Sequence, residues 1–152
     1  MDYNVNVNVN AGGQPNYSAP YPALKTNRGL LKTILLSIIT LGIYPLFVFS
    51  NISTDINTIA SRYDGKKTTH FLLVFFIFSW LTLGIYPIIW MHNISKRIGD
   101  ELMRRRIPYS FGAGTFWGWN VLGMLIGIGP LVYEHKLFRA MNLLCGDYNV
   151  NG

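Results

Sequence analysis

Cysteine and charge are both scarce in this chain. Cys145 is the only cysteine among 152 residues, so no internal disulfide can form, and the paired cysteines of a zinc site are missing. Only 13% of the residues are charged, whereas half are hydrophobic. These shortages exclude a disulfide-rich secreted domain. They also make an ordinary soluble domain of this length a poor interpretation.

Charge is missing almost completely from three long stretches. Lys32 is the only charged residue in Leu30–Phe49, and neither Phe71–Met91 nor Phe111–Tyr133 contains one. A helix of about 20 residues spans the roughly 30 Å hydrocarbon core of a bilayer. The three stretches therefore predict an all-α integral membrane protein. A soluble protein with three buried helices is the weaker alternative, because such helices rarely lack charge over this length.

Acidic residues are absent from the same stretches, which removes the signature of a proton relay or of ion coupling. The sequence has no glycine-rich nucleotide loop and no metalloprotease motif. Histidines occur only at the edges of the stretches (His70, His92 and His135), where an interfacial position explains them. We therefore expect no catalytic residue, no cofactor and no metal site.

What the sequence does contain is a repeat. TLGIYP occurs at Thr40–Pro45 and again 42 residues later, at Thr82–Pro87. Asn-Ile-Ser follows both copies at the same distance, and Gly127–Pro130 is a decayed third copy. The pattern predicts a membrane domain over residues 28–145, built from three units at about 28–69, 70–110 and 111–145. Each unit is expected to be one supersecondary element that packs on its neighbours.

The repeated motif combines residues that end helices with residues that begin them. Glycine is common just past the end of a helix, and proline is common in the first turn of one. The motif therefore predicts either a stop and restart or a kink in a continuous helix. Its tyrosines are typical of a membrane interface. The predicted helix-break residues are Gly42, Tyr44, Pro45, Gly84, Tyr86, Pro87, Gly127 and Pro130.

Two topologies follow from these alternatives. If each unit is one kinked span, the termini lie on opposite sides, and the excess of Lys and Arg on the N-terminal side favours a cytoplasmic N-terminus. If each unit is a short hairpin with the motif at its tip, all the basic residues face one side. A half-helix of about 12 residues is only about 18 Å long, however. We therefore expect three spans rather than three hairpins.

An amphipathic stretch follows each break. Apolar residues recur there at helical spacing, and in the second unit Lys96, Arg97, Asp100 and Glu101 are assigned to the opposite, polar face. The pattern predicts an interfacial amphipathic helix or a helix packed in a bundle. The apolar positions are Ile52, Ile56 and Ile59, then Ile94, Ile98 and Leu102, then Leu137, Met141 and Leu144.

Basic residues flank the apolar stretches and stay out of their interiors. Anionic lipid headgroups attract such charges, so membrane lipids are the predicted partners. The aromatic residues lie in the apolar stretches and not among the basic ones, which argues against a nucleic-acid partner. The candidate headgroup contacts are Lys66, Lys67, Lys96, Arg97, Arg104, Arg105 and Arg106.

Glycines in the third unit occur at the G-x-x-x-G spacing, at Gly114 and Gly118 and again at Gly123 and Gly127. This spacing lets two helices approach closely. It predicts packing within the monomer or a homo-oligomer, and both alternatives stay open.

The two ends are polar. Residues 1–27 are predicted to be a disordered tail, although the NVNVNVN alternation is also compatible with an edge strand. Residues 146–152 are predicted to be a short polar tail. Because no early apolar segment is present, we expect no cleavable signal peptide, and we expect the first apolar stretch to act as the insertion signal.

The stretch LLSIITLGIYPLFVFSNISTDIN resembles the signature of a prokaryotic integral membrane domain family of unknown function. Members of that family carry TLGIY followed by an aromatic-rich turn and an amphipathic helix. YjgN-like uncharacterised membrane proteins look similar at the same motif. The resemblance covers about Leu30–Asn142. Many relatives have a tryptophan after the motif, which Trp90 matches and Val48 does not. The resemblance implies a protein of the prokaryotic cytoplasmic membrane and supplies no activity.

These observations predict a small, polytopic, non-enzymatic membrane protein that acts as a scaffold or self-assembling subunit. The alternative is a channel or transporter-like component whose broken helices line a path. That alternative needs polar groups that converge in mid-membrane. The sequence offers only Ser37, Thr40, Ser79, Thr82 and Asn120 for this role. An enzyme acting on lipid is disfavoured because paired catalytic groups are missing.

Overall fold

The computed structural model describes residues 7–9, 15–17 and 23–152. Apart from two paired three-residue strands, the regular structure in these residues is helical, as predicted. Val7 lies opposite Tyr17 in the antiparallel strand pair. The elements are β1 (Val7–Val9), β2 (Pro15–Tyr17), α1 (Leu30–Ile39), α2 (Ile43–Asp64), α3 (Phe71–Leu73), η1 (Val74–Phe78), α4 (Ser79–Leu81), α5 (Ile85–Arg104), α6 (Ala113–Thr115), η2 (Phe116–Val121), η3 (Leu122–Ile126) and α7 (Gly129–Asn151).

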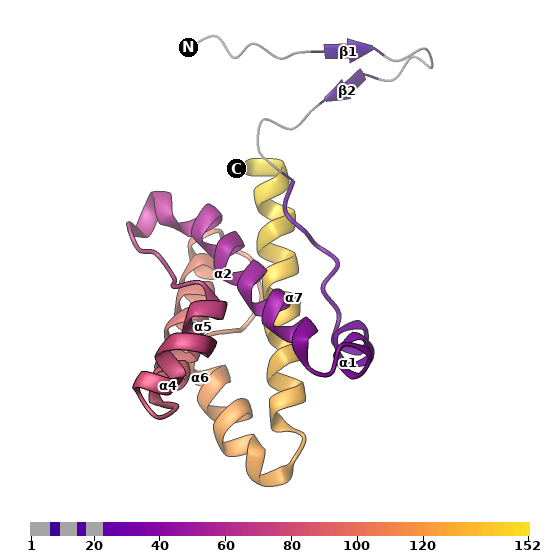
Figure 1. Ribbon diagram of the computed structural model, residues 1–152. Coiled ribbons are helices and arrows are strands. Elements are labelled where there is room, and N and C mark those ends of the chain that lie inside the picture. The colour runs from indigo at the N-terminus through magenta and orange to yellow at the C-terminus, as the bar shows by residue number, and fades with distance from the viewer. Residues whose placement is uncertain (1–6, 10–14, 18–22) are drawn as a thin grey trace.

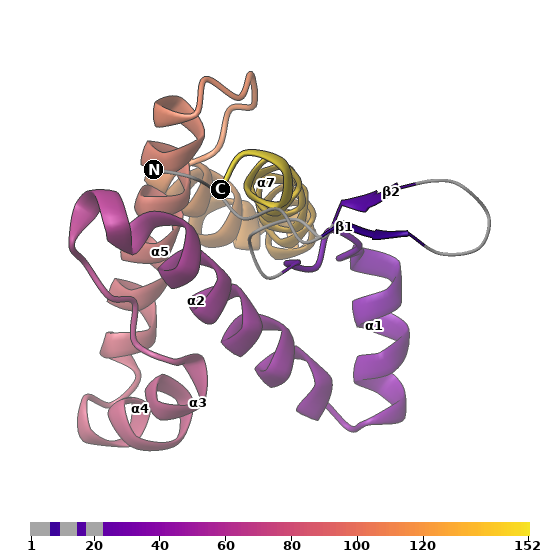
Figure 2. The same cartoon turned by 90° about the horizontal axis from the view of Figure 1, so that it is seen from above.

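Short helical arms alternate with long helices. The first arm is α1. The second is the continuous helical stretch of α3, the π-helical η1 and α4, and the third is made of α6, the π-helical η2 and the 3-10 helix η3. The long helices α2, α5 and α7 contact one another. Figure 1 shows them meeting in the middle of the molecule, and Figure 2 shows α1 and α4 splayed outward.

The first arm ends in two consecutive left-handed residues. α1 stops at Ile39, and Leu41 and Gly42 follow with φ of 51° and 85°. The N–H of Gly42 donates to the carbonyl of Ser37 at 2.7 Å, which satisfies one of the last carbonyls of α1. Glycine adopts a positive φ at little cost, so its place in the motif is the one that the turn requires.

The next helix starts from the same turn. The Thr40 hydroxyl accepts a hydrogen bond from the Tyr44 N–H at 2.9 Å and so caps an otherwise unpaired donor of α2. Pro45 lies in the first turn of α2, where the missing N–H costs nothing. The motif is therefore a stop and restart, not a kink in one helix.

The second copy has the same geometry. Leu83 and Gly84 have φ of 52° and 86°, and the Tyr86 N–H donates to the Thr82 hydroxyl at 3.0 Å. Before the third long helix only Gly127 is left-handed, with φ of 81°, and a 3-10 helix takes the place of the α-helical ending. Pro130 lies in the first turn of α7.

These breaks correct the prediction of three kinked spans. Among the described residues, no helix has both the length and the apolar character needed to cross a membrane. The physical reason is the turn itself. It divides each apolar stretch between a short arm and the start of a long helix, and α1, with 10 residues, is about 15 Å long.

The core lies where the three long helices meet. The nine apolar positions predicted from helical spacing are all fully buried there, three from each of α2, α5 and α7. Of the two predicted alternatives, the apolar faces of these stretches show packing in a bundle. Their apolar faces pack against one another, which leaves none of those nine side chains to contact acyl chains.

Glycines allow one very close approach within the third unit. A Cβ on Gly129 would lie 2.2 Å from the carbonyl carbon of Gly123, so the start of α7 presses directly on η3. Gly114, Gly118 and Gly127 face open space instead. Of the four glycines predicted to mediate packing, only Gly123 does so within the chain, and Gly129 is its partner.

Both polar tails extend the fold. Residues 146–152 are predicted to be a short polar tail, but α7 continues through them to Asn151. On its side lie residues 23–28: Asn149 exchanges two hydrogen bonds with the backbone of Leu24, and Asn142 exchanges two with that of Arg28. The rest of the predicted disordered tail lies outside the described residues, except for β1 and β2.

The approach of Gly129 to Gly123 gives a testable prediction. Gly129→Ala should lower the free energy of unfolding by about 1–3 kcal/mol, because overpacking against backbone cannot be relieved by a side-chain rotation. Gly118→Ala, whose Cβ would meet nothing within 4 Å, is the matched control and should stay within about 1 kcal/mol of the wild type. Thermal unfolding followed by circular dichroism measures both. Equal effects of the two variants would contradict the packing described here.

Candidate functional site

The turns between arms and long helices carry the most exposed apolar side chains of the described chain. Leu41, Leu83 and Leu125 are 92%, 94% and 89% exposed. We call these three turns with their exposed apolar neighbours the tips. They comprise Ile38, Ile39, Leu41, Ile43 and Phe47 in the first; Trp80, Leu81, Leu83, Ile85, Ile88 and Ile89 in the second; and Leu122, Met124, Leu125, Ile126, Ile128 and Leu131 in the third.

Two of these leucines occupy strained backbone. A left-handed conformation costs a residue other than glycine about 1–2 kcal/mol, and Asn or Gly is the usual choice there. Leu41 and Leu83 nevertheless place a large apolar side chain in that position, with almost no protein around it. Backbone strain of this kind is enriched at functional sites. Among the described residues other than glycine, Arg106 also has a positive φ, of 55°.

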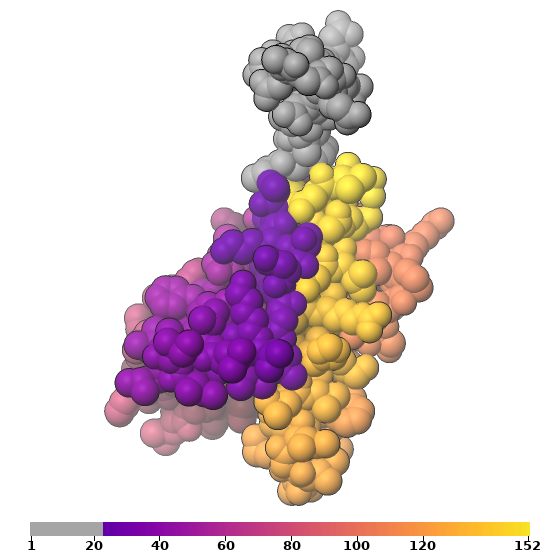
Figure 3. Space-filling view, turned by 90° about the vertical axis from the view of Figure 1, so that its right-hand side faces the viewer, coloured from indigo at the N-terminus to yellow at the C-terminus, as the bar shows by residue number. Residues whose placement is uncertain are grey.

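Each long helix changes character after its first turns. On α2 the exposed apolar surface of the tip reaches Phe47 and Asn51 is exposed next, while on α5 it reaches Ile89 and Asn93 follows. Single apolar side chains are exposed again near the far ends, namely Tyr63, Met103 and Val150. Figure 3 shows the part of the chain near residue 125 at the lower end of the molecule, opposite the end where α7 finishes. The molecule therefore has an apolar end formed by the tips and a polar end formed by the far ends of the long helices.

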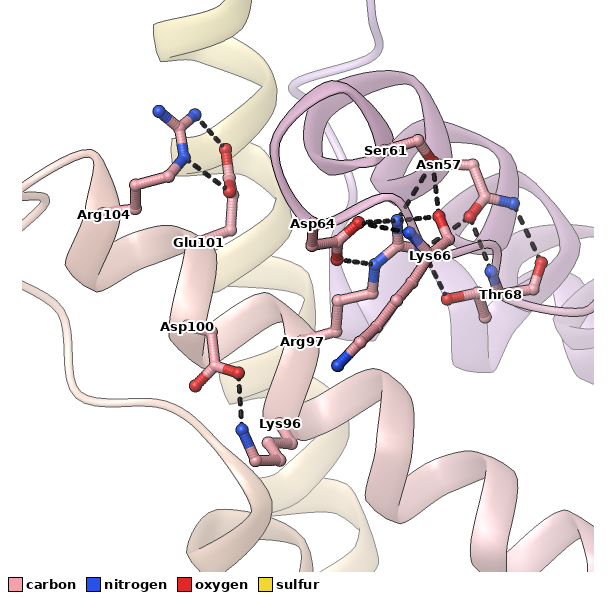
Figure 4. Close-up of polar contacts among 10 residues, drawn as sticks. All are labelled: Asn57, Ser61, Asp64, Lys66, Thr68, Lys96, Arg97, Asp100, Glu101 and Arg104. Carbon is pink, nitrogen blue, oxygen red and sulfur yellow. Dashed lines mark hydrogen bonds and ion pairs between the residues drawn. The ribbon is translucent and has the colours of Figure 1, made fainter.

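Arg97 organises the polar end. Its side chain is only 8% exposed, and all three guanidinium nitrogens donate hydrogen bonds that join α5 to the end of α2 and the loop after it (Figure 4). The acceptors are both carboxylate oxygens of Asp64 (2.6 and 3.0 Å), Asn57 Oδ1 (2.6 Å), Thr68 Oγ1 (2.8 Å), Ser61 Oγ (3.0 Å) and the Lys66 carbonyl (2.6 Å).

The partners of Arg97 also hold one another. Asn57 exchanges two hydrogen bonds with the backbone of Thr68, at 2.7 and 2.8 Å. Burial raises the pKa of Asp64, but the hydrogen bonds from Arg97 and the Lys66 N–H outweigh that effect and leave its pKa below the ordinary value. The carboxylate therefore stays charged at neutral pH, as a bidentate partner of arginine requires.

Two further arginines form ion pairs at the same end of the molecule. Arg105, which follows the last residue of α5 and whose side chain is almost fully buried, bridges Glu101 on α5 (2.7 Å) and Asp147 on α7 (2.5 Å). Residues 23–28, which precede α1, are called the strap; Arg28 pairs with Asp55 and so fixes the strap to α2. Buried arginines thus link the strap to α2, α2 to α5, and α5 to α7.

This geometry changes the assignment of the predicted headgroup cations. Arg97 and Arg105 are internal and cannot reach lipid, and Arg104 pairs with Glu101 at 2.5 Å. Lys96 forms an exposed pair with Asp100 at 2.6 Å. The structure shows no partner within the described residues for the ammonium groups of Lys66 and Lys67 or for the Arg106 guanidinium.

The buried face of α5 differs from the prediction, because it includes two charged residues. Arg97 and Glu101 were placed on the polar face, yet both are buried beside Ile94 and Ile98. The signal was available, because positions 94, 97, 98 and 101 share one face of a helix. The partners Asn57, Ser61, Asp64 and Thr68 had no such signal. Their role depends on how α2 and its following loop pack against α5.

Cys145 is buried, which affects the reactivity of its thiol. Burial raises the pKa of Cys145 to about 11, so the thiol stays protonated at neutral pH and is a poor nucleophile. No cluster of three or more His, Cys, Asp or Glu side chains in this part of the chain is placed to hold a metal ion. Of the three histidines, His92 accepts a hydrogen bond from the Trp117 indole at 3.0 Å.

A known domain family matches part of this chain. A DUF4234 domain, which is a domain of unknown function, is found at residues 28–100. It begins at the arginine that joins the strap to α2, includes both TLGIYP turns and the Arg97 network, and ends before α7. The resemblance to a domain family of unknown function is confirmed, whereas the likeness to YjgN-like proteins and the assignment to a prokaryotic membrane family stay predictions. No curated protein and no solved structure matches the chain.

The Arg97 network gives a second prediction. Arg97→Met should lower the free energy of unfolding by about 3–5 kcal/mol, since it leaves Asp64 and several polar groups without their donor. Lys96→Met is the matched control on the same helix. It breaks only an exposed pair and should cost no more than about 1 kcal/mol. Denaturant titration of both variants measures the difference. A loss below about 1 kcal/mol for Arg97→Met would show that the network does not support the fold.

Proposed function

We propose that the protein is a non-enzymatic membrane scaffold. In this proposal three repeated hairpin units insert their tips into lipid, while the helical core and the basic loops stay at the membrane surface. The observation that carries the proposal is the set of three exposed tips, two of which hold a leucine in strained backbone. The role agrees with the scaffold predicted from the sequence, but the topology differs, because hairpins replace spans.

Lipid is the occupant that the tips favour. Exposed apolar patches larger than a few hundred Å² mark interaction sites on proteins. Trp80, 82% exposed at the second tip, belongs to a residue type that is common at the membrane interface. The net charge of +6 complements anionic lipid headgroups.

The length of the arms supports insertion to a limited depth. α1 has 10 residues and is about 15 Å long, which is close to half of the roughly 30 Å hydrocarbon core. Each tip is therefore proposed to enter one leaflet and return. The polar ends of α2, α5 and α7 then lie on one side with the unpaired Lys66, Lys67 and Arg106. The preference of basic loops for the cytoplasmic side makes that side cytoplasmic.

A channel receives less support from the described residues. The hydroxyls of Ser37, Thr40 and Thr82 each donate to a carbonyl four residues earlier in their own helix, at 2.5–2.7 Å. These groups are therefore satisfied locally and do not converge on a path.

Self-assembly rests on one feature. Gly114 and Gly118 face open space and leave room for a second copy of the chain, which a native mass measured in membranes would test.

Charge placed at the tips tests lipid insertion. Leu83→Asp combined with Leu125→Asp should reduce binding to phosphatidylcholine vesicles more than tenfold in a flotation assay. Aspartate in the hydrocarbon region costs about 3 kcal/mol relative to leucine at each site. Neither side chain has significant contacts in the fold, so circular dichroism should be unchanged.

Met103→Asp combined with Val150→Asp is the matched control. These side chains are 72% and 79% exposed but lie at the polar end, so flotation should stay within twofold of the wild type. If both double variants reduce flotation equally, the tips are not the lipid-binding surface. If the tip variant floats normally but changes from an oligomer to a monomer, the tips contact another copy of the chain instead.

A further inference from the structure

A cavity of about 610 Å³ lies beside the Arg97 network. Its walls are the end of α2, the loop that follows it, and the α5 side chains of Tyr86, Trp90, Asn93 and Lys96. Its volume is within the range of sites for small molecules. The Trp90 indole donates to the Thr69 carbonyl at 2.8 Å and so fixes the loop against α5.

The cavity has more positive charge than its own carboxylates neutralise. Asp64 is held by Arg97, Asp100 by Lys96, and Glu101 by Arg104. The remaining charged groups in the wall are Lys66 and Lys67, and neither ammonium group forms a hydrogen bond or ion pair with the described residues, although the charge of Lys66 helps to lower the pKa of Asp64. Figure 4 shows the Lys66 side chain extending past Arg97 with no dashed line at its nitrogen. A ligand with about two negative charges would neutralise these two exposed, adjacent cations.

The depth of the cavity matches the headgroup layer of the proposed orientation. The exposed apolar side chains of the second tip reach Ile89 on α5, and the lining residues Asn93 and Lys96 lie one and two turns further from the tip. A phosphate of a lipid whose chains surround the tips would be at this level.

Cavities recur at the corresponding place of the other two hairpins. One of about 270 Å³ is lined by Lys25, Lys32 and Asn51, and Asn51 corresponds to Asn93 in the repeat. Another of about 470 Å³ is lined by Lys136, which follows the decayed motif at the matching position. Lysine therefore lines all three cavities, while the carboxylates and arginines of the largest one are absent from the third.

We propose that the cavity beside Arg97 binds a phosphomonoester, with Lys66 and Lys67 supplying the charge and Asn93, Thr69 and the Tyr86 hydroxyl supplying neutral hydrogen-bonding groups. The Arg97 network holds the loop in place and does not contact the ligand. The phosphate belongs to a lipid headgroup or to a soluble phosphate ester. For the lipid source, this inference rests on the membrane role proposed above.

The lipid arm of the test compares vesicles with phosphatidic acid and vesicles with phosphatidylglycerol, adjusted to equal surface potential. Wild-type protein should bind the phosphatidic acid vesicles at least fivefold more tightly. Lys66→Gln combined with Lys67→Gln should remove this preference, because both ammonium groups are lost while the backbone contacts of the loop remain. Arg139→Gln removes positive charge outside the three cavities and should keep the preference.

The soluble arm titrates the protein with glycerol 3-phosphate and follows the Trp90 indole N–H by nuclear magnetic resonance. A saturable shift that the Lys66/Lys67 variant loses supports the site. If it occurs without a preference for phosphatidic acid, the source is a soluble ester, whereas a lipid preference assigns the site to a headgroup.

The inference is overturned if neither arm shows binding, or if the preference survives in the Lys66/Lys67 variant. Flotation on phosphatidylcholine, which has no phosphomonoester, separates this outcome from failure of the membrane role. Vesicle binding that persists there without any phosphatidic acid preference rejects the cavity site and leaves the membrane role standing. Loss of all flotation together with retained glycerol 3-phosphate binding rejects the membrane role and leaves the cavity site standing.

Discussion

The architecture depends on a chain reversal through two consecutive left-handed residues. At Leu41–Gly42 and at Leu83–Gly84 the arm ends, the threonine before the turn caps the next helix, and a proline occupies the first turn after it. The cost of a left-handed leucine, about 1–2 kcal/mol, is offset by these capping hydrogen bonds. Because the chain reverses there, the two halves of each apolar stretch share one tip instead of forming a span.

The opposite end of the molecule holds the fold together. The splayed arms bury few side chains, so the fold is held by the core of α2, α5 and α7 and by the buried arginines behind it. Replacing one partner in such a pair leaves a buried charge unmatched, so the pairs fix how the helices are arranged even where they add little net stability. Apolar residues are therefore free to remain exposed at the tips.

Local features of this fold were predictable from the sequence, and long-range ones were not. The helical spacing of Ile94, Ile98 and Leu102 identified the buried face of α5, and glycine and proline located the turns, because these are properties of neighbouring residues. The choice between a kink and a reversal depends on the backbone of Leu41, which no propensity predicts. Arg97 was misassigned because charge was taken as a sign of exposure, whereas its acceptors come from a different helix and a loop.

The central claim is that three tips enter lipid from one side while the ends of the long helices remain in water. Single cysteines in a Cys145→Ala background, placed at positions 41, 83 and 125 and at positions 63, 106 and 150, test it in sealed vesicles. A membrane-impermeant maleimide added on one side should label all three of the second set. A fluorophore at each of the first set should be quenched by brominated lipid chains. Labelling of positions 63 and 106 from opposite sides, or tips that react freely in water, would contradict the account.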